Sequence, residues 1–311
     1  MALQRQKQTR PVVAFLNSGS RSGFTRPLAA FHRGLKEAGY KGQDVAVEFT
    51  WANGKVDQLP ALAAGLFRRR VDLVTVTGGI TPARAAVEAR NQAPGARDVP
   101  LVFSGCDPDE VGLVNDFERP DRNATGVDVC VRKGLPHRPF LVNELVPGAD
   151  LALIVKPGTL GADLEKKEAE EAAAANGRKA LILEAKTESD FPEAFATCRR
   201  QGIGVLLVQA DAFFTSQRKK IVALAARHKL PAIYPWREYA EAGGLMSYGP
   251  NLANAWRQVG FYSGMILKGK KPADLPVLQN SPEFVINLKA AKAIGLQVPA
   301  KLLAQADEII E

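Results

Sequence analysis

An aromatic ring beside a guanidinium is the most distinctive pair of side chains in this sequence. Trp236 and Arg237 follow an apolar stretch that ends at Tyr234 and that we predict to be a strand. In an open α/β sheet, ligands bind just beyond the carboxyl ends of the strands. A flat indole and a bidentate cation suit a small aromatic or carboxylate-bearing molecule. The alternative is that Trp236 caps the sheet and that Arg237 pairs with Glu238 or Glu241 on the surface.

Three short loops of small polar residues are candidates for the rest of a binding site. Each follows a predicted strand and precedes a predicted helix: Ser18-Gly19-Ser20, Thr77-Gly78-Gly79 and Ser104-Gly105-Cys106-Asp107. N–H groups at helix N-termini bind carboxylates and phosphates. The alternative is turn chemistry alone, with glycine at positive φ and serine as a helix cap. Because the three loops would share one edge of one sheet, we favour a binding site.

The second half of the chain adds Asp211 and Phe213, which follow another predicted strand at residues 205–208. An acidic side chain at a strand end is a suitable partner for a ligand amine or hydroxyl. The alternative for Phe213 is a place in the hydrophobic core.

No motif for catalysis, a cofactor or a metal is present in the sequence. It lacks G-x-G-x-x-G, G-x-S-x-G and H-E-x-x-H. The three cysteines, Cys106, Cys130 and Cys198, cannot all pair and form no C-x-x-C, so no disulfide framework or zinc site can be read from them. The sequence therefore predicts no catalytic residue, no metal and no cofactor.

Bulk composition favours a soluble two-domain protein. The chain has 311 residues, 46% of them hydrophobic, and a net charge of +8. Its basic residues are spread and mostly end predicted helices, where cations complement the helix dipole, so we expect no nucleic-acid partner. No segment resembles a membrane span, and the first ten residues lack the apolar region of a signal peptide.

Short apolar strands alternate with amphipathic helices in two successive runs. The first run places strands near residues 12–16, 44–50, 73–76 and 100–103, and the second near 151–155, 180–183, 205–208 and 232–234. This pattern predicts an α/β protein of two Rossmann-like lobes with parallel sheets. Ligands often bind in a cleft between such lobes.

The tail consists of a long amphipathic helix from residue 252, a strand at 283–287 and a last short helix ending near 294. These are too few for a third domain, so we expect them to complete the two lobes. One lobe would contain residues 11–127 and 250–280, and the other 128–249 and 281–311. Residues 1–10 would be disordered, or the start of a mature or recombinant chain. The hinge would have about three crossings, near 125–129, 248–251 and 278–283, with Gly126 and Gly249 absorbing rotation.

Four segments resemble a known family over nearly the whole chain. They are FHRGLKEAGY (31–40), YPWREYAEAGGLMSY (234–248), ILKGKKPADLPV (266–277) and VINLKAAKAIGL (285–296). The chain resembles the substrate-binding proteins of ABC importers, in the group of tryptophan- and tyrosine-type binders with the type I periplasmic-binding-protein fold. Lys156 departs from this resemblance, because relatives usually have asparagine there.

The resemblance implies a monomeric periplasmic or extracytoplasmic protein that captures a small solute, such as an amino acid or aromatic acid, and delivers it to an ABC permease. By position, the family's ligand loops fall on Ser18, Gly19, Ser20, Gly78, Gly79, Thr81, Ser104, Gly105, Cys106, Asp107, Asp211, Phe213, Trp236 and Arg237. Two alternatives share the two-lobed plan: the ligand-sensing core of a transcription regulator, and a glycosyltransferase-like enzyme. The few residues before the first strand leave no room for a helix-turn-helix, and we find no catalytic base or phosphate clamp.

Overall fold

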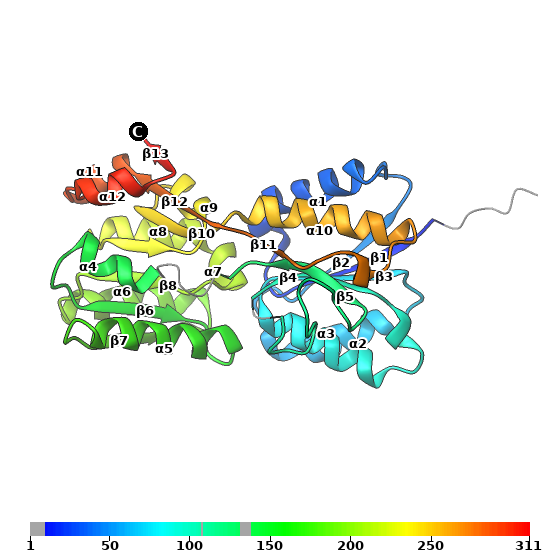
Figure 1. Ribbon diagram of the computed structural model, residues 1–311. Coiled ribbons are helices and arrows are strands. Elements are labelled where there is room, and N and C mark those ends of the chain that lie inside the picture. Colours follow the sequence, from blue (N-terminus) through cyan, green and yellow to red (C-terminus); the bar gives the residue numbers. More distant parts are fainter. Residues whose placement is uncertain (1–9, 107, 131–137) are drawn as a thin grey trace, which may run out of the picture.

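A computed structural model describes residues 10–106, 108–130 and 138–311. The predicted disordered segment, apart from Arg10, and the predicted ligand residue Asp107 lie outside the described residues. Two α/β lobes lie side by side (Figure 1). This confirms the expected fold class.

Lobe 1 is built on a six-stranded sheet of order β11-β5-β4-β3-β1-β2, in which all the strand pairs are parallel. Its strands are β1 (Val12–Asn17), β2 (Ala46–Trp51), β3 (Leu73–Thr77), β4 (Leu101–Gly105), β5 (Ala124–Asp128) and β11 (Leu278–Gln279). The four inner strands, β5, β4, β3 and β1, are almost entirely buried, as expected for a parallel sheet covered on both faces.

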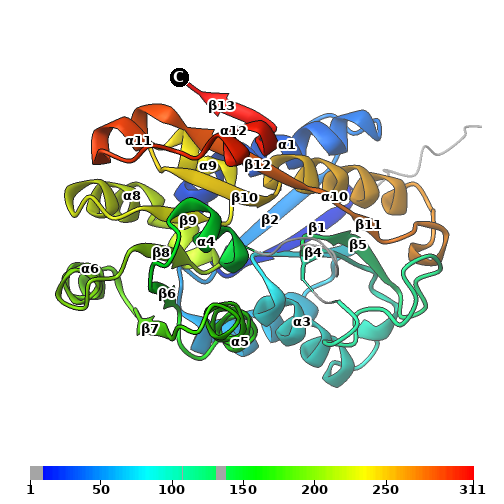
Figure 2. The ribbon, with the colours of Figure 1, turned by 60° about the vertical axis from the view of Figure 1, so that its left-hand side comes forward.

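Alternate residues of β1 pack against different helices, because successive side chains of a strand point to opposite faces. Val13 and Phe15 join the cluster that includes α1 (Thr25–Glu37) and α10 (Leu252–Leu267). Ala14 and Leu16 join the one that includes α2 (Leu59–Phe67) and α3 (Ile80–Gln92). α1 and α10 lie together over one face of the sheet (Figure 2).

Lobe 2 is built on a seven-stranded sheet of order β13-β12-β10-β9-β8-β6-β7. Its strands are β6 (Leu151–Val155), β7 (Ala180–Glu184), β8 (Val205–Val208), β9 (Ala232–Tyr234), β10 (Met246–Pro250), β12 (Pro282–Asn287) and β13 (Glu308–Ile310). The β10–β12 pair is antiparallel, which is a correction to the wholly parallel sheet expected from the sequence. The reason is that β10 leads out of lobe 2 into lobe 1, whereas β12 returns from lobe 1 into lobe 2. The two neighbouring strands therefore run in opposite directions.

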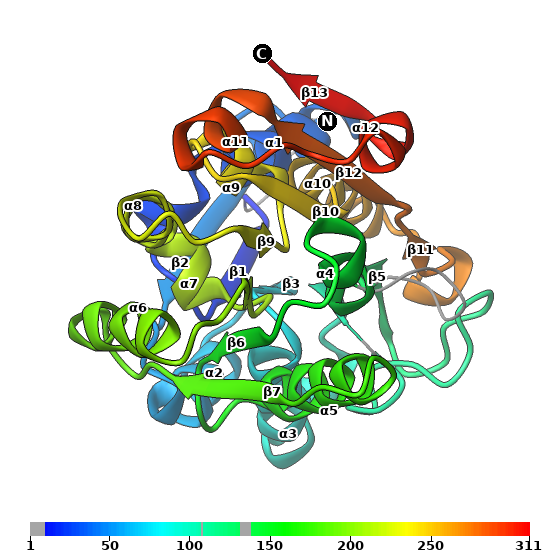
Figure 3. The same ribbon diagram turned by 90° about the vertical axis from the view of Figure 1, so that its left-hand side faces the viewer.

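Helices cover both faces of the second sheet (Figure 3). One cluster of buried side chains draws on α4 (Leu141–Leu145), α5 (Leu160–Ala174), α11 (Leu288–Ile294) and α12 (Ala300–Gln305). The other draws on α6 (Phe191–Arg200), α7 (Ala212–Ser216), α8 (Arg218–Arg227) and α9 (Arg237–Glu241). α7 begins at the Asp211 cap and ends at Ser216, and Gln217 separates it from α8.

The last residues also differ from expectation. α12 and β13 follow α11, where the sequence predicted no further element after residue 294. Gly295 ends α11 in the left-handed conformation, and β13 then adds an edge strand parallel to β12.

The chain passes between the sheets after β5, between β10 and α10, and between β11 and β12. Gly126 and Gly249 both lie within strands, not in the connecting segments. A Cβ at Gly126 would lie 2.1 Å from the carbonyl oxygen of Phe103, and one at Gly249 would lie 2.1 Å from that of Pro235. The close approach of a neighbouring backbone therefore explains why glycine is needed at both positions, and hinge rotation does not.

Candidate functional site

The N-terminus of α3 points into the cleft from lobe 1. Gly78 and Gly79 precede the helix with φ of 90° and 108°, a conformation that favours glycine. The hydroxyl of Ser18 donates to the carbonyl of Gly78 at 2.6 Å, and Asn17 Nδ2 donates to Thr77 Oγ1 at 2.7 Å. These bonds hold the loop while the first N–H groups of the helix have no intrahelical acceptor. The loop is therefore suited to an anionic group.

Asp211 faces the cleft from lobe 2. It is the N-cap of α7, and its Oδ1 accepts a hydrogen bond from the N–H of Phe213 at 2.7 Å. Burial raises the pKa of the Asp211 carboxyl, and the hydrogen bond from Phe213 and the nearby Lys156 cation oppose that rise. Lys156 is itself buried, with its Nζ 4.3 Å from the centre of the Phe213 ring and donating to the carbonyl of Lys186. The site thus has a fixed carboxylate.

Two small cavities, of about 50 Å³ and about 20 Å³, lie between the lobes and share four lining residues: Gly78, Gly79, Ala210 and Asp211. The larger of these is walled by aromatic rings, those of Phe24, Trp236 and Trp256. Eight of the predicted ligand residues line one cavity or the other: Ser18, Gly78, Gly79, Thr81, Ser104, Cys106, Asp211 and Trp236. A third cavity of about 550 Å³ lies away from the cleft, between α1 and β2 on lobe 1, and contains none of them.

Four other predicted ligand residues support these walls without lining either cavity. A Cβ at Gly19 would lie 2.9 Å from the carbonyl oxygen of Ala212, so this glycine permits close contact between the lobes. The N–H of Ser20 donates to Ser216 Oγ at 3.1 Å, across the same contact. The carbonyl of Gly105 accepts from the N–H of Val129, and Phe213 packs under Lys156.

Arg237 lies among carboxylates instead of in the cavities. Its guanidinium pairs with Glu241 at 3.0 Å, with Glu308 at 2.7 Å and with Glu283. The structure therefore favours the alternative weighed from the sequence, in which Arg237 pairs with Glu241, and it adds two partners distant in sequence. Trp236 is buried, as the capping alternative required, and also lines the cavity.

Several cavity residues were missed by the sequence prediction. Phe24, Val129, Thr215, Leu252 and Trp256 line the larger cavity. Trp256 and Leu252 belong to α10, whose helical spacing of apolar residues indicates only a buried face. Phe24 and Trp256 stack with their ring centres 5.4 Å apart. No local signal distinguishes a core residue at the cleft from one elsewhere in the core.

Cys106 and Cys130 form a disulfide, whereas the sequence predicted no disulfide framework. The bond joins the end of β4 to the segment that leaves β5, and Cys106 lines the larger cavity. Cys198 is free and buried, and burial raises the pKa of its thiol to about 11. Because the chain has three cysteines, the sequence alone does not show which two are paired. The pairing became evident only from the neighbouring ends of β4 and β5.

Comparisons with known proteins place the chain in a family. The family model described as ABC transporter substrate binding protein matches residues 13–310. A tyrosine-binding protein of Clostridioides difficile is 25% identical over 274 residues, which cover 86% of this chain and 76% of that protein.

Two solved structures illustrate the shared fold. An ABC domain in complex with L-Trp from Streptococcus pneumoniae has a TM-score of 0.80 at 22% identity, covering 97% of this chain and all (100%) of that one. A conserved domain protein from Vibrio cholerae has a TM-score of 0.82 at 23% identity, covering 96% and 99%.

Substrate-binding proteins of ABC importers act outside the cytoplasm, where they bind a small solute for a membrane permease. Among the described residues, no helix is both long enough and apolar enough to cross a bilayer. The match over residues 13–310 confirms the resemblance found in the sequence: this chain belongs to the family of ABC transporter substrate-binding proteins.

Proposed function

We propose that this protein captures a small amino acid, or a related aromatic or carboxylate-bearing solute, in the cleft between its lobes. It would deliver the solute to its permease without transforming it, as a monomer in the periplasm or another extracytoplasmic space. The tyrosine-binding relative and the L-Trp complex support the choice of an amino acid.

One observation carries this proposal. The Asp211 carboxylate and the N-terminus of α3 line the same small cavities from opposite lobes. A zwitterion matches both groups, since its ammonium would pair with Asp211 and its carboxylate would accept hydrogen bonds from the helix N–H groups. Asp211 is the only ionisable side chain among the described residues lining these cavities, apart from the oxidised Cys106.

The remaining walls select the side chain of the solute. Phe24, Trp236 and Trp256 present flat apolar surfaces in the larger cavity, with Ser104 and Thr215 as polar groups. About 50 Å³ holds a few water molecules and is below the size of ordinary ligand pockets. The lobes therefore have to part for a solute to enter. We propose that residues 11–127 with 250–280 move as one body and 128–249 with 281–311 as the other.

A thermal-shift screen of the natural amino acids and of aromatic carboxylates tests the proposal. A ligand at a hundredfold excess over its Kd stabilises the folded state by about 2.7 kcal/mol, enough to raise Tm by several degrees. Isothermal titration should then give a single site, and native mass spectrometry of fresh protein should show the same solute. If no amino acid shifts Tm while a nucleotide sugar is turned over, the proposal is wrong.

A further inference from the structure

An ion-pair network joins the two lobes on the side of the cleft where Arg237 lies. The Arg237 guanidinium donates from all three nitrogens: Nε to Glu241, Nη1 to Glu283 and Nη2 to Glu308. Its side chain is only 13% exposed. An arginine held by three carboxylates in a half-buried cluster is geometrically fixed in a way that a surface pair is not.

Glu283 connects this cluster to two of the connections between the lobes. It lies at the start of β12, opposite Gly249 of β10, so the β10–α10 and β11–β12 connections run side by side there. Its second carboxylate oxygen accepts from Asn251 Nδ2 at 3.2 Å. Asn251 caps α10, accepting from the N–H of Asn254 at 3.0 Å, and α10 packs on lobe 1. One carboxylate is thus held from both lobes.

Glu241 connects the same cluster to the surface where the lobes meet. Its Oε1 accepts from Arg237 Nε and also from Arg26 Nη1, which lies on α1 of lobe 1. Close by, Arg218 Nη1 of lobe 2 donates to the carbonyl of Gly23 in lobe 1 at 2.9 Å. The network is therefore continuous. It extends from the Arg26–Glu241 contact, which forms when the lobes close, to the β10–α10 and β11–β12 connections, about which they close.

We propose that Arg237 is a positioning residue for lobe closure. It holds the side chains of Glu241 and Glu283, so that the Arg26–Glu241 contact between the lobes is coupled to the hinge segments beside Glu283. The inference rests on the proposed solute capture, since it concerns the closed arrangement in which a solute would be held. Without Arg237, Glu241 and Glu283 would lose the cation that fixes their side chains, so the Arg26 contact and the Asn251 contact would each lose a fixed partner and the lobes would separate more readily.

The test is the distance between the lobes in the unliganded protein. Spin labels on Gln92→Cys of α3 and Glu170→Cys of α5 report it, because both positions are exposed and the two helices approach each other across the cleft. Arg237→Ala should raise the ratio of open to closed protein about tenfold, the factor expected for one charge-assisted hydrogen bond. Arg237→Lys keeps the charge but loses the several N–H donors of the planar guanidinium. It should therefore raise the ratio of open to closed protein less than Arg237→Ala does.

Arg257→Ala is the matched control. Arg257 pairs with Glu37 at 2.6 Å within lobe 1, so its loss should leave the distance distribution unchanged. Adding Arg26→Ala to Arg237→Ala should change the open-to-closed ratio by less than the product of the two single effects, because both act through Glu241.

An unchanged distance distribution in folded Arg237→Ala protein would overturn the inference. Should that variant fail to fold, Glu283→Gln removes one partner alone and must shift the distribution in the same direction, or the inference is wrong. No ligand is needed for this measurement, so a failed ligand screen would contradict the proposed solute without affecting this result.

Discussion

At the scale of single residues, Asp211 is the side chain that we propose recognises the ammonium group of the solute. It is held by the N–H of Phe213 and faces the α3 N-terminus across the cleft. A carboxylate fixed in this way is already oriented before the ligand arrives, so little ordering entropy opposes binding.

Asp211→Asn should weaken the binding of a zwitterionic amino acid by about 1.5–3 kcal/mol, because a charge-assisted hydrogen bond to the ammonium is lost. Isothermal titration measures the difference. Asp163→Asn, on the exposed side of α5, is the control and should bind like the wild type. Equal affinities for the Asp211 variant and the wild type would remove Asp211 from the ligand site.

The affinity should also depend on pH. Burial raises the pKa of Asp211, and only its ionised form attracts an ammonium group. As the pH falls, affinity should therefore begin to decline at a higher pH than for an ordinary carboxyl. Titrations over a pH series should show this acid limb in the wild type and not in Asp211→Asn. A limb of the same size in both proteins would assign the effect to another group.

Glu238 is a buried carboxylate that makes no stabilising side-chain hydrogen bond among the described residues. It is 5% exposed, and neither carboxylate oxygen has a hydrogen-bond partner among the described residues. Burial raises its pKa, and Glu241 adds to the rise. The cost of burying the ionised form is therefore fully present above this raised pKa, declines as the pH falls below it and is gone below the pKa of the unfolded chain.

Glu238→Gln should accordingly be more stable than the wild type by on the order of 1 kcal/mol at high pH, since an amide carries no buried charge. The gain should shrink as the pH is lowered. Urea denaturation at several pH values measures it, with the exposed Glu170→Gln as the control. A gain that does not vary with pH would show that the charge of Glu238 is not its cause.

At the scale of elements, the Cys106–Cys130 disulfide braces the proposed ligand site. It joins the ends of the neighbouring strands β4 and β5 over a separation of 24 residues, beside the larger cavity. A cross-link of this length restricts the unfolded chain, and here it also ties a loop that lines the cavity to the first connection between the lobes.

Reduction of this disulfide should lower stability by about 2–4 kcal/mol and weaken solute binding. Denaturation and titration with and without a phosphine reductant measure both effects. The variant carrying Cys106→Ser and Cys130→Ser should already show the loss and should not respond to reductant. If that variant responds as the wild type does, the effect of the reductant arises elsewhere.

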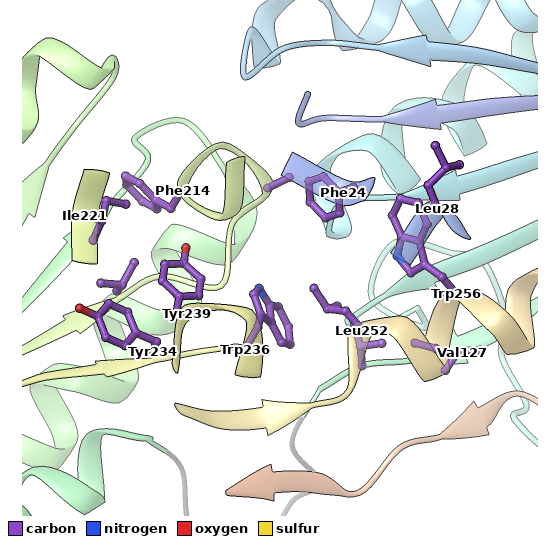
Figure 4. Close-up of a cluster of buried hydrophobic side chains, with 14 of the residues drawn as sticks. Phe24, Leu28, Val127, Phe214, Ile221, Tyr234, Trp236, Tyr239, Leu252 and Trp256 are labelled. Atoms are coloured by element: carbon purple, nitrogen blue, oxygen red, sulfur yellow. The ribbon is translucent and has the colours of Figure 1, made fainter. Parts of the chain in front are cut away.

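At the scale of the whole molecule, one apolar cluster runs through both lobes. Figure 4 shows Phe24, Leu252 and Trp256 of lobe 1 facing Trp236 and Tyr239 of lobe 2, with buried side chains continuing on either side. Burial of apolar surface between the lobes favours the closed arrangement, so this contact and the charged network act in the same direction.

X-ray scattering should therefore show a compact protein when the solute is bound, with a profile matching this closed arrangement. The unliganded protein should have a larger radius of gyration, because the cavity of about 50 Å³ cannot admit a solute without opening. Identical profiles with and without a ligand whose binding is confirmed by calorimetry would contradict hinge closure.

The sequence by itself determined most of the strands, most of the helices and the family. Periods of 2 and 3.6 and the glycine-rich loops act over a few residues, so Leu151–Val155 and the Gly78-Gly79 turn could be read locally. Tertiary structure alone decided the antiparallel β12, the disulfide partner of Cys106, the place of Trp256 in the cavity wall and the two distant partners of Arg237. Each of these depends on segments far apart in the chain, as Glu283 and Glu308 are from Arg237, and no local pattern records which distant segment will be the neighbour.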